Sequence, residues 1–224
     1  MSSDVRLVLL GKQGAGKGTQ AERVAAHYGV PHISTGDMFR AAAAAGTPFG
    51  RRAAEYMDNG ELVPDDVVIG VVAERLAQDD ALDGFVLDGF PRTRTQAEEL
   101  HRILAPGDLD ATVDIDVPTP VAQRRLSGRR VCKTCGAIYH IDRPPKRNWT
   151  CDIDGGDVIQ REDDQEAAIA RRLELYEQET GPLIGYYAEL GILGTVNGVG
   201  SVDEVFDRII NSVDDARRPR LSAR

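Results

Sequence analysis

Short runs of Val, Leu and Ile alternate along this sequence with longer stretches whose apolar residues recur at helical spacing. The runs are almost continuously apolar, which is typical of strands that are buried on both faces of a parallel sheet. They predict strands at residues 6–10, 32–33, 85–88, 112–117 and 193–197. Strands that alternate with helices in this order predict an α/β fold, in which helices cover both faces of a parallel sheet.

Capping residues mark where several of the helices begin. A helix is predicted over residues 65–78, directly after a proline, and Thr119 is predicted as the N-cap of a helix with Pro120 in its first position. A hydroxyl residue followed three positions later by Glu or Gln forms a capping box. This spacing occurs at 201–204 and at 93–96.

Two segments interrupt the alternation of strands and helices. Residues 34–63 are predicted to be a helical insertion, because alanine, which fills positions 41–45, is the best helix former. Residues 128–164 are rich in Gly, Pro, Cys and charged residues and are too long for an ordinary loop, so they are expected to be functional or held by a metal. The polar tail 214–224 is expected to fray. The core would then consist of residues 1–33, 64–127 and 165–224.

The composition is that of a water-soluble globular protein. The chain has 224 residues, of which 42% are hydrophobic, enough for one domain with a sizeable core. No stretch approaches the 18 apolar residues expected of a membrane span, and the apolar run at the N-terminus is too short for a secretory signal. We therefore expect a cytoplasmic protein.

Charge is unevenly distributed along the chain. The formal net charge is −9, which disfavours binding to nucleic acid on average. Residues 121–150 nevertheless carry a single acid, Asp142, among eight basic residues: Arg124, Arg125, Arg129, Arg130, Lys133, Arg143, Lys146 and Arg147. This segment is either a local anion-binding site or a solvated basic face, and composition alone does not decide between them.

A glycine-rich loop follows the first predicted strand and precedes a predicted helix. Residues 11–19 read Gly-Lys-Gln-Gly-Ala-Gly-Lys-Gly-Thr, which matches the G-x-x-x-x-G-K phosphate loop in its required context. The backbone amides and the helix N-terminus attract phosphate oxygens, and Lys17 adds a positive charge. Gly18 occupies the position where Ser or Thr usually binds Mg²⁺, so the nearest hydroxyl is that of Thr19.

An acidic residue and two arginines follow other predicted turns. Asp88 ends a buried strand, where the carboxyl edge of a parallel sheet places ligands, and an acid there suits Mg²⁺, directly or through water. Arg40 and Arg92 lie beside Gly, Pro and Asp turns, and the forked guanidinium of arginine is well suited to bind phosphate. The sequence therefore predicts a second phosphate site near the first.

The three cysteines lie within twenty residues of one another. Cys132-x-x-Cys135 is followed after fifteen residues by Cys151-x-x-Asp154, which is zinc-ribbon spacing and provides four ligands. A closed set of four protein ligands is structural rather than catalytic. A polar cluster without metal is the alternative interpretation, and His140 is a rival ligand outside both pairs.

These motifs together resemble the adenylate kinase family, in its long bacterial form, over residues 5–213. The motifs that carry the resemblance are the phosphate loop, His32-Ile-Ser-Thr-Gly-Asp-Met-Phe-Arg40, Gly60-Glu-Leu-Val-Pro-Asp65 and Asp88-Gly-Phe-Pro-Arg92. The resemblance implies a five-stranded parallel core, an AMP-binding insertion at 34–63 and a lid over ATP at 128–164. It implies a monomer that transfers a phosphoryl group from ATP, with Mg²⁺, to AMP, and it allows structural Zn²⁺ in the lid.

The resemblance also assigns residues to the two nucleotides. AMP would be held by Thr35, Arg40, Glu61, Leu62, Val63, Gly89, Phe90, Pro91, Arg92, Gln96, Arg161 and Arg172. ATP would be held by Gly14, Ala15, Gly16, Lys17, Gly18, Thr19, Arg129, Ile138, Tyr139 and Gly200. Catalysis would depend on Lys17, Arg92, Arg129, Arg161 and Arg172, with Asp88 holding magnesium through water. Gln96 would read the adenine edge, and Thr35 favours adenylate over uridylate or cytidylate.

Two alternative functions remain open from the sequence. A zinc ribbon in a basic segment could bind a polynucleotide, which would make the protein a P-loop ATPase. The acidic balance and the scarcity of aromatic residues in 128–164 argue against this interpretation. A kinase that uses another acceptor base, or GTP as the phosphoryl donor, is the closer alternative.

Overall fold

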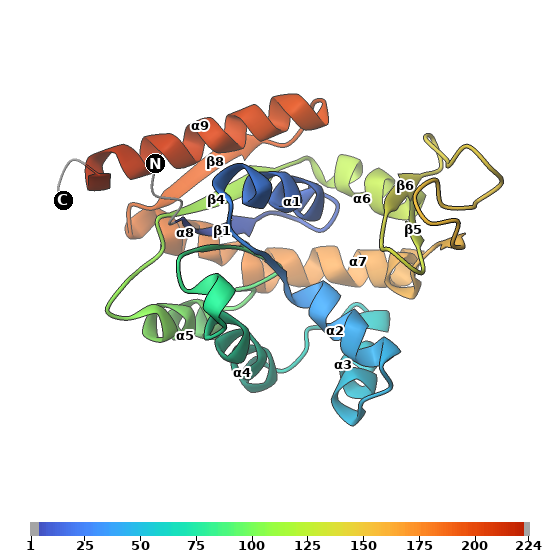
Figure 1. Ribbon diagram of the computed structural model, residues 1–224, viewed down its shortest axis with the longest axis horizontal. Coiled ribbons are helices and arrows are strands. Elements are labelled where there is room, and N and C mark those ends of the chain that lie inside the picture. The colour runs from blue at the N-terminus through green and yellow to red at the C-terminus, as the bar shows by residue number, and fades with distance from the viewer. Residues whose placement is uncertain (1–4, 222–224) are drawn as a thin grey trace.

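In the computed structural model, which describes residues 5–221 and the side chains up to 218, a parallel sheet lies at the centre of the chain (Figure 1). Its strands are ordered β2-β3-β1-β4-β8, and every neighbouring pair runs parallel. The bounds are β1 Arg6–Leu10, β2 His32–Ser34, β3 Phe85–Asp88, β4 Ala111–Asp116 and β8 Leu193–Asn197. All five predicted strands are confirmed, with shifts of one residue at the ends of β2 and β4.

Helices cover both faces of this sheet because its strands are apolar on both sides. Along β1, Leu7 and Leu9 face one hydrophobic cluster, whereas Val8 and Leu10 face the other. The first cluster includes apolar residues of α1 (Lys17–Tyr28), α6 (Thr119–Gly128), α7 (Glu166–Leu175) and α9 (Val202–Leu221). The second includes residues of α4 (Asp65–Leu76), α5 (Arg94–Leu104) and α8 (Pro182–Glu189). The predicted α/β fold, a core of five parallel strands flanked by helices, is confirmed.

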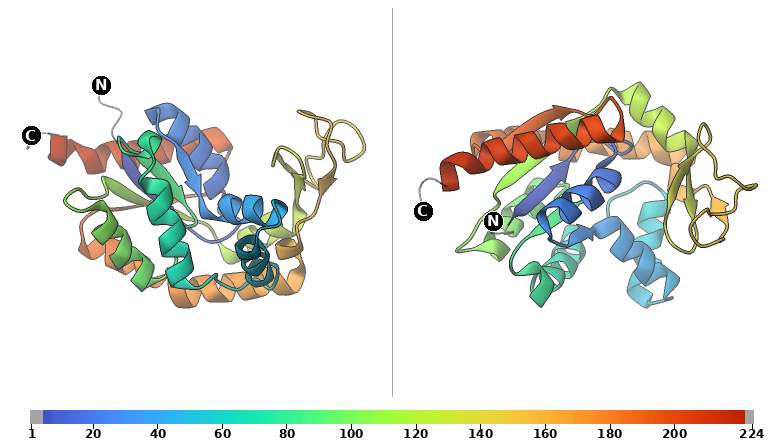
Figure 2. Two further views of the ribbon diagram at one scale, coloured as in Figure 1. Left: turned by 60° about the horizontal axis from the view of Figure 1, so that its bottom comes forward. Right: turned by 45° about the horizontal axis from the view of Figure 1, so that its top comes forward.

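Two excursions leave the core, one in each of the two segments that interrupt the alternation of strands and helices in the sequence. Helices α2 (Thr35–Ala44) and α3 (Pro48–Asp58) form the first one and pack against each other. The second contains an antiparallel sheet of β5 (Arg129–Cys132), β6 (Ile138–His140) and β7 (Val158–Ile159), ordered β6-β5-β7. Figure 2 shows both excursions projecting from the same end of the molecule. Short 3₁₀ turns at Asp79–Ala81 and Glu162–Asp164 and a π-helical turn at Tyr176–Thr180 complete the elements.

Some predicted helix boundaries are corrected by the structure. Helix α4 ends at Leu76 rather than near Gln78, and α6 already begins at Thr119, with Pro118 rather than Thr119 at the N-cap. Pro118 still has an extended conformation, with φ −57° and ψ 139°. The helix therefore begins at Thr119, one residue earlier than predicted, and Pro120 lies within its first turn.

The two predicted capping boxes have different outcomes. At Ser201 the box is complete: its hydroxyl accepts from the Glu204 amide at 3.3 Å, and the Glu204 carboxylate accepts from the Ser201 amide at 2.8 Å. At Thr93 only the first half forms, with the Gln96 amide donating to the threonine hydroxyl at 3.2 Å. The Gln96 side chain turns away from the cap, for a reason given below.

The expectation that the C-terminal tail frays is wrong as far as residue 221, because α9 continues through it. The helix is held against α1: Val213 is buried, Asp214 accepts a 3.0 Å hydrogen bond from the Tyr28 hydroxyl, and the Arg217 guanidinium lies over the Tyr28 ring. Residues 222–224 lie outside the described part. Within residues 5–221, no helix combines the length and the hydrophobicity that a membrane span requires.

Candidate active site

A cavity of about 1480 Å³ opens at the carboxyl ends of the core strands, between the core and the two excursions. Ligands of open α/β sheets bind at this edge. All of the residues assigned above to ATP, AMP and magnesium line the cavity except Phe90. The Phe90 side chain is buried in the second hydrophobic cluster, so only its backbone is available to a ligand.

The phosphate loop between β1 and α1 has the backbone geometry that its glycines permit. Gly14 and Gly16 have φ values of 83° and 103°, and a Cβ on Gly14 would lie 2.6 Å from the Ala122 carbonyl oxygen. The Lys17 ammonium donates to the Gly11 carbonyl at 2.6 Å and to the Lys12 carbonyl at 3.1 Å. Burial lowers the pKa of Lys17 to about 8, although Asp88 opposes this shift.

Arg125 holds the phosphate loop in place by hydrogen bonds to its backbone. In the sequence it stood out only as part of a basic segment. Its guanidinium donates to the Ala15 carbonyl at 3.0 Å, more weakly to that of Gly14 at 3.4 Å, and to the Gly198 carbonyl at 3.1 Å. It thereby joins the phosphate loop to the segment after β8 that carries Gly200. Its position in the sequence could not distinguish it from its exposed neighbour Arg124, the other arginine of α6.

Asp88 ends β3, as predicted, and lies beside the start of α1. A Cβ on Gly18 would lie 3.5 Å from an Asp88 carboxylate oxygen, so the carboxylate is close to the first turn of α1. His32 Nε2 lies 3.7 Å from the same carboxylate. A carboxylate beside a phosphate loop fits the oxygen ligands that Mg²⁺ prefers.

Five arginines from five different segments line the cavity: Arg40, Arg92, Arg129, Arg161 and Arg172. Burial lowers the pKa of Arg92 and of Arg161 to about 10, and the charge of another arginine adds to the shift in each case. Burial likewise lowers the pKa of Arg172. Cations so close together destabilise one another, which means that a polyanion in the cavity would be strongly favoured.

Two buried acids that the sequence analysis missed hold part of this cluster in place. Asp164, in the turn before α7, accepts from Arg129 Nε at 2.7 Å and from a second Arg129 nitrogen at 2.6 Å. It also accepts from Arg172 at 3.3 Å, and Arg172 contacts Asp163 at 3.0 Å. Burial opposes the charge of Arg129, but the hydrogen bonds to Asp164 outweigh this effect and raise its pKa. Within a run of charged residues, neither acid carries a sequence signal that separates it from a solvated one.

The predicted AMP pocket is organised around Gly89, whose φ is 79°. Its carbonyl accepts from the Thr35 hydroxyl at 3.0 Å and from Arg92 Nε at 2.8 Å. The π-helical turn, which no sequence pattern predicted, places Thr180 so that its hydroxyl donates to the Arg92 carbonyl at 2.9 Å. Thr35 and Arg92 are therefore fixed relative to each other.

On the predicted ATP side, the lid strand β6 and the loop after β8 line the cavity. Ile138 is half-exposed there, so an apolar surface is available to a base. The Tyr139 hydroxyl is engaged within the lid, where it accepts from the Asp152 amide at 2.8 Å. Gly200 has a φ of 143°, and a Cβ there would lie 2.9 Å from a Glu204 carboxylate oxygen. Gly200 can accordingly offer only its backbone.

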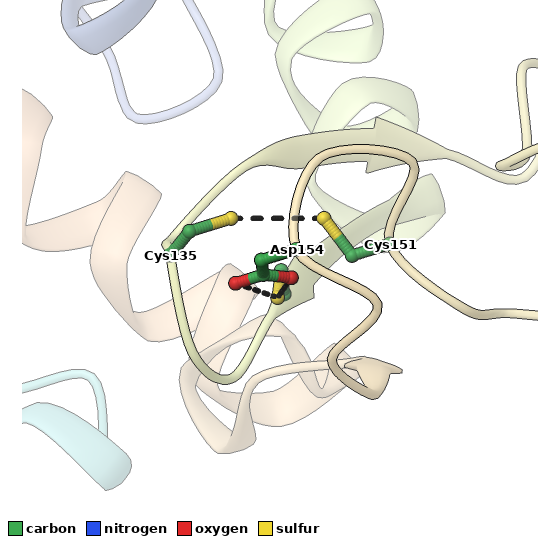
Figure 3. A group of neighbouring side chains, drawn as sticks. Cys135, Cys151 and Asp154 are labelled. Carbon is green, nitrogen blue, oxygen red and sulfur yellow. Dashed lines mark hydrogen bonds between the residues drawn. The ribbon is translucent and has the colours of Figure 1, made fainter.

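The four predicted metal ligands of the lid come together in the structure. The ligand atoms of Cys132, Cys135, Cys151 and Asp154 all lie within 4.8 Å of one another. Figure 3 labels three of them, Cys135, Cys151 and Asp154. The sulfurs of Cys135 and Cys151 are 3.6 Å apart, and that of Cys132 is 3.3 Å from Asp154 Oδ1. Sulfurs bound to one tetrahedral Zn²⁺ at about 2.3 Å lie about 3.8 Å apart, so this donor set fits zinc.

The rival ligand His140 points elsewhere. Its Nδ1 accepts from the Asp142 amide at 3.1 Å, and its Nε2 lies 3.3 Å from the Arg124 carbonyl. Among the described residues, the group that could hold a metal ion contains no histidine.

Comparison with known proteins agrees with this geometry. The sequence model of the adenylate kinase family matches residues 9–192. An adenylate kinase from Thermodesulfovibrio yellowstonii is 53% identical over 208 residues, which cover 92% of this chain and 97% of that protein. Adenylate kinases from Listeria monocytogenes serotype 4a and from Geobacillus sp. WCH70 are each 52% identical over 205 residues, covering 90% of this chain and 95% of each relative. The chain therefore belongs to the adenylate kinase family.

Proposed function

We propose that this protein is an ATP:AMP phosphotransferase, which reversibly converts ATP and AMP into two molecules of ADP and so balances the adenine nucleotides. The observation that carries this proposal is the cavity itself, where a phosphate loop and a cluster of five arginines lie at one sheet edge. Two anionic nucleotides bound there would meet with their phosphate groups between the loop and the arginines. An ATPase that hydrolyses its substrate has no need of the second pocket.

The donor side of the proposed site comprises the phosphate loop, Lys17, Arg129 and the lid. Backbone amides of Gly14–Thr19 would bind the β- and γ-phosphates, and Lys17 would leave the loop carbonyls to follow the transferred group. Magnesium, when it is bound with the triphosphate, neutralises phosphate charge, and Asp88 would hold it through water. The base would lie against Ile138 and the backbone near Gly200.

The acceptor side comprises Thr35, Arg40, Arg92, Gln96 and residues 61–63, which lie between α3 and α4. The arginines would grip the AMP phosphate, which already bears the attacking oxygen and needs no general base. Transfer then depends on in-line positioning and on charge stabilisation by Lys17 and the arginines. Closure of residues 128–164 over the nucleotides would exclude water, and with it hydrolysis of ATP.

The lid cluster supports a further part of the proposal, namely one structural zinc ion held by Cys132, Cys135, Cys151 and Asp154. Zinc analysis of the reduced protein, purified without chelator, is expected to give one ion per chain. A content well below one would contradict the site. We also propose that the enzyme is cytoplasmic, in keeping with its composition, and monomeric, as its resemblance to the family implies.

The proposed reaction is tested by phosphoryl transfer from ATP and Mg²⁺ to AMP, CMP, UMP and GMP. ADP formation that depends on AMP, with the other acceptors much slower, is the expected result. Equal rates with UMP or CMP would contradict the roles of Thr35 and Gln96, and hydrolysis stimulated by polynucleotide would contradict the reaction itself. Lys17→Met and Arg92→Ala are expected to slow turnover by orders of magnitude while the circular dichroism spectrum is unchanged.

A further inference from the structure

The amide of Gln96 is held on both sides by the protein. Its oxygen accepts a hydrogen bond from the Arg92 backbone amide at 2.7 Å, and its nitrogen donates to Asp65 Oδ1 at 2.7 Å. Asp65 is the first residue of α4 and does not line the cavity, whereas the almost completely buried Gln96 does. These contacts explain why the Gln96 side chain does not complete the helix cap of Thr93.

The two partners determine which way the amide points. The Arg92 amide can only donate a hydrogen bond, and a carboxylate offers only acceptors. Turning the Gln96 amide over would place its oxygen against the Asp65 carboxylate and its NH₂ against the Arg92 N–H. One contact would then be between two acceptors and the other between two donors, so neither could form a hydrogen bond and this orientation is disfavoured.

The fixed amide still has one N–H and one oxygen lone pair to offer, because each end can form two hydrogen bonds. Adenine presents an acceptor at N1 and a donor at its 6-amino group, which match this pair. Hypoxanthine and guanine present a donor at N1 and an acceptor at O6, which match only the overturned amide. A site built for one hydrogen-bonding pattern rejects the reverse pattern because buried polar groups stay unpaired.

We propose that Asp65 determines the specificity for the acceptor base, by holding the Gln96 amide in the orientation that accepts adenine and rejects 6-oxopurines. Asp65 is a positioning residue, since it acts through Gln96 and contacts no substrate. This inference rests on the proposed function, in which Gln96 faces the base of AMP. Asp65 also accepts from the Thr93 hydroxyl at 2.8 Å, which fixes its own carboxylate.

The test compares AMP with IMP, a 6-oxopurine that lacks the 2-amino group of guanine, and measures ADP and IDP directly by anion-exchange chromatography. In Asp65→Asn, the new amide can turn so that its NH₂ donates to the Gln96 oxygen. The overturned Gln96 amide then keeps only its unfavourable contact with the Arg92 N–H, and the unfavourable contact with a carboxylate is gone. The ratio of kcat/KM for IMP to that for AMP is expected to rise about tenfold, the factor that corresponds to one hydrogen bond of ordinary strength. Both acceptors are measured on one preparation, so any loss of folded protein cancels from the ratio.

Two variants separate this role from a merely structural one. Asp66→Asn removes the neighbouring, exposed carboxylate from the same helix start and is expected to leave the ratio unchanged. Thr93→Val removes the other partner of Asp65 and the cap of α5, but leaves the hydrogen bond to Gln96. It is expected to lower stability without changing the ratio.

An unchanged ratio in Asp65→Asn, or an equal rise in Thr93→Val, would overturn the inference while the proposed reaction stood. Absence of AMP-dependent ADP formation by the unsubstituted protein would instead overturn the proposed function, and the inference with it.

Discussion

Replacing Asp164 with alanine is expected to destabilise the protein because the change leaves two buried arginines without their shared partner. The Asp164 side chain is fully buried and accepts two short hydrogen bonds from Arg129 and a longer one from Arg172. Arg172 would keep Asp163, whose carboxylate is 3.0 Å away. Among the described residues, the Arg129 side chain has no other hydrogen-bond partner.

The size of the effect follows from the burial of the three groups. Removing one member of a buried ion pair costs about 3–5 kcal/mol because the remaining charge is left uncompensated. The side chains of Arg129 and Arg172 are 18% and 16% exposed toward the cavity, so water can reach them in part. We therefore expect the low end of the range, about 3 kcal/mol, which corresponds to about 6–12 °C in Tm for a chain of this size.

Urea unfolding and calorimetry measure this change, with Glu162→Ala as the matched control. Glu162 lies in the same turn but is exposed, and its loss is expected to change the free energy of unfolding by less than about 0.5 kcal/mol. A triphosphate should restore part of the lost stability, because it would pair with the freed arginines. If Asp164→Ala proved as stable as Glu162→Ala, the arginines would not depend on this carboxylate, and the reasoning would be refuted.

Three further predictions follow from other parts of the molecule. Lys17→Met is expected to be more stable than the unsubstituted protein at pH 7, by up to about 3 kcal/mol in urea unfolding. The pKa of Lys17 is about 8 in the folded protein and 10.5 ordinarily, so the folded protein loses the unfavourable buried charge as the pH rises. The difference in unfolding free energy between the two proteins should therefore disappear between pH 8 and 10.5. A difference that does not depend on pH would contradict this prediction. Gly50→Ala is expected to lower the free energy of unfolding by about 1–3 kcal/mol, because a Cβ there would overlap the Ala42 backbone where α2 and α3 pack together. It is also expected to raise KM for AMP more than it lowers kcat. An unchanged Tm and KM would argue against this prediction. Cys151→Ser is expected to abolish stoichiometric zinc binding and to lower Tm. Asp157→Asn, which changes an exposed acid of the same segment, is the control and should change neither. Full zinc content in the serine variant would rule out the four-ligand site.

The parts of the fold that the sequence predicted are those encoded by local patterns. The strands of the core sheet stand out because both faces are buried, and the phosphate loop is recognised from its own nine residues. The lid strands were not predicted, because β5 begins with Arg129 and Arg130 and contains no apolar run. Their pairing depends on backbone hydrogen bonds and on cysteines that converge only after folding.

The supporting residues of the site escaped prediction for a similar reason. Asp65 lies at a helix start, where an acid is explained equally well by the helix dipole, and its partner Gln96 is 31 residues away. Asp164 meets Arg129 from 35 residues away. Motifs therefore predicted residues that the fold brings together at one cavity, but the residues that hold those side chains in place became visible only in three dimensions.

The pairing of Arg129 with Asp164 also has a consequence for how this protein can change over evolution. The two residues mark the entry and the exit of the lid, so the intervening segment leaves the core and returns at nearly the same place. A segment inserted in this way can be lengthened, shortened or exchanged without moving the strands beneath it. A segment held by hydrogen bonds instead of metal could accordingly be grafted onto this core between these two residues.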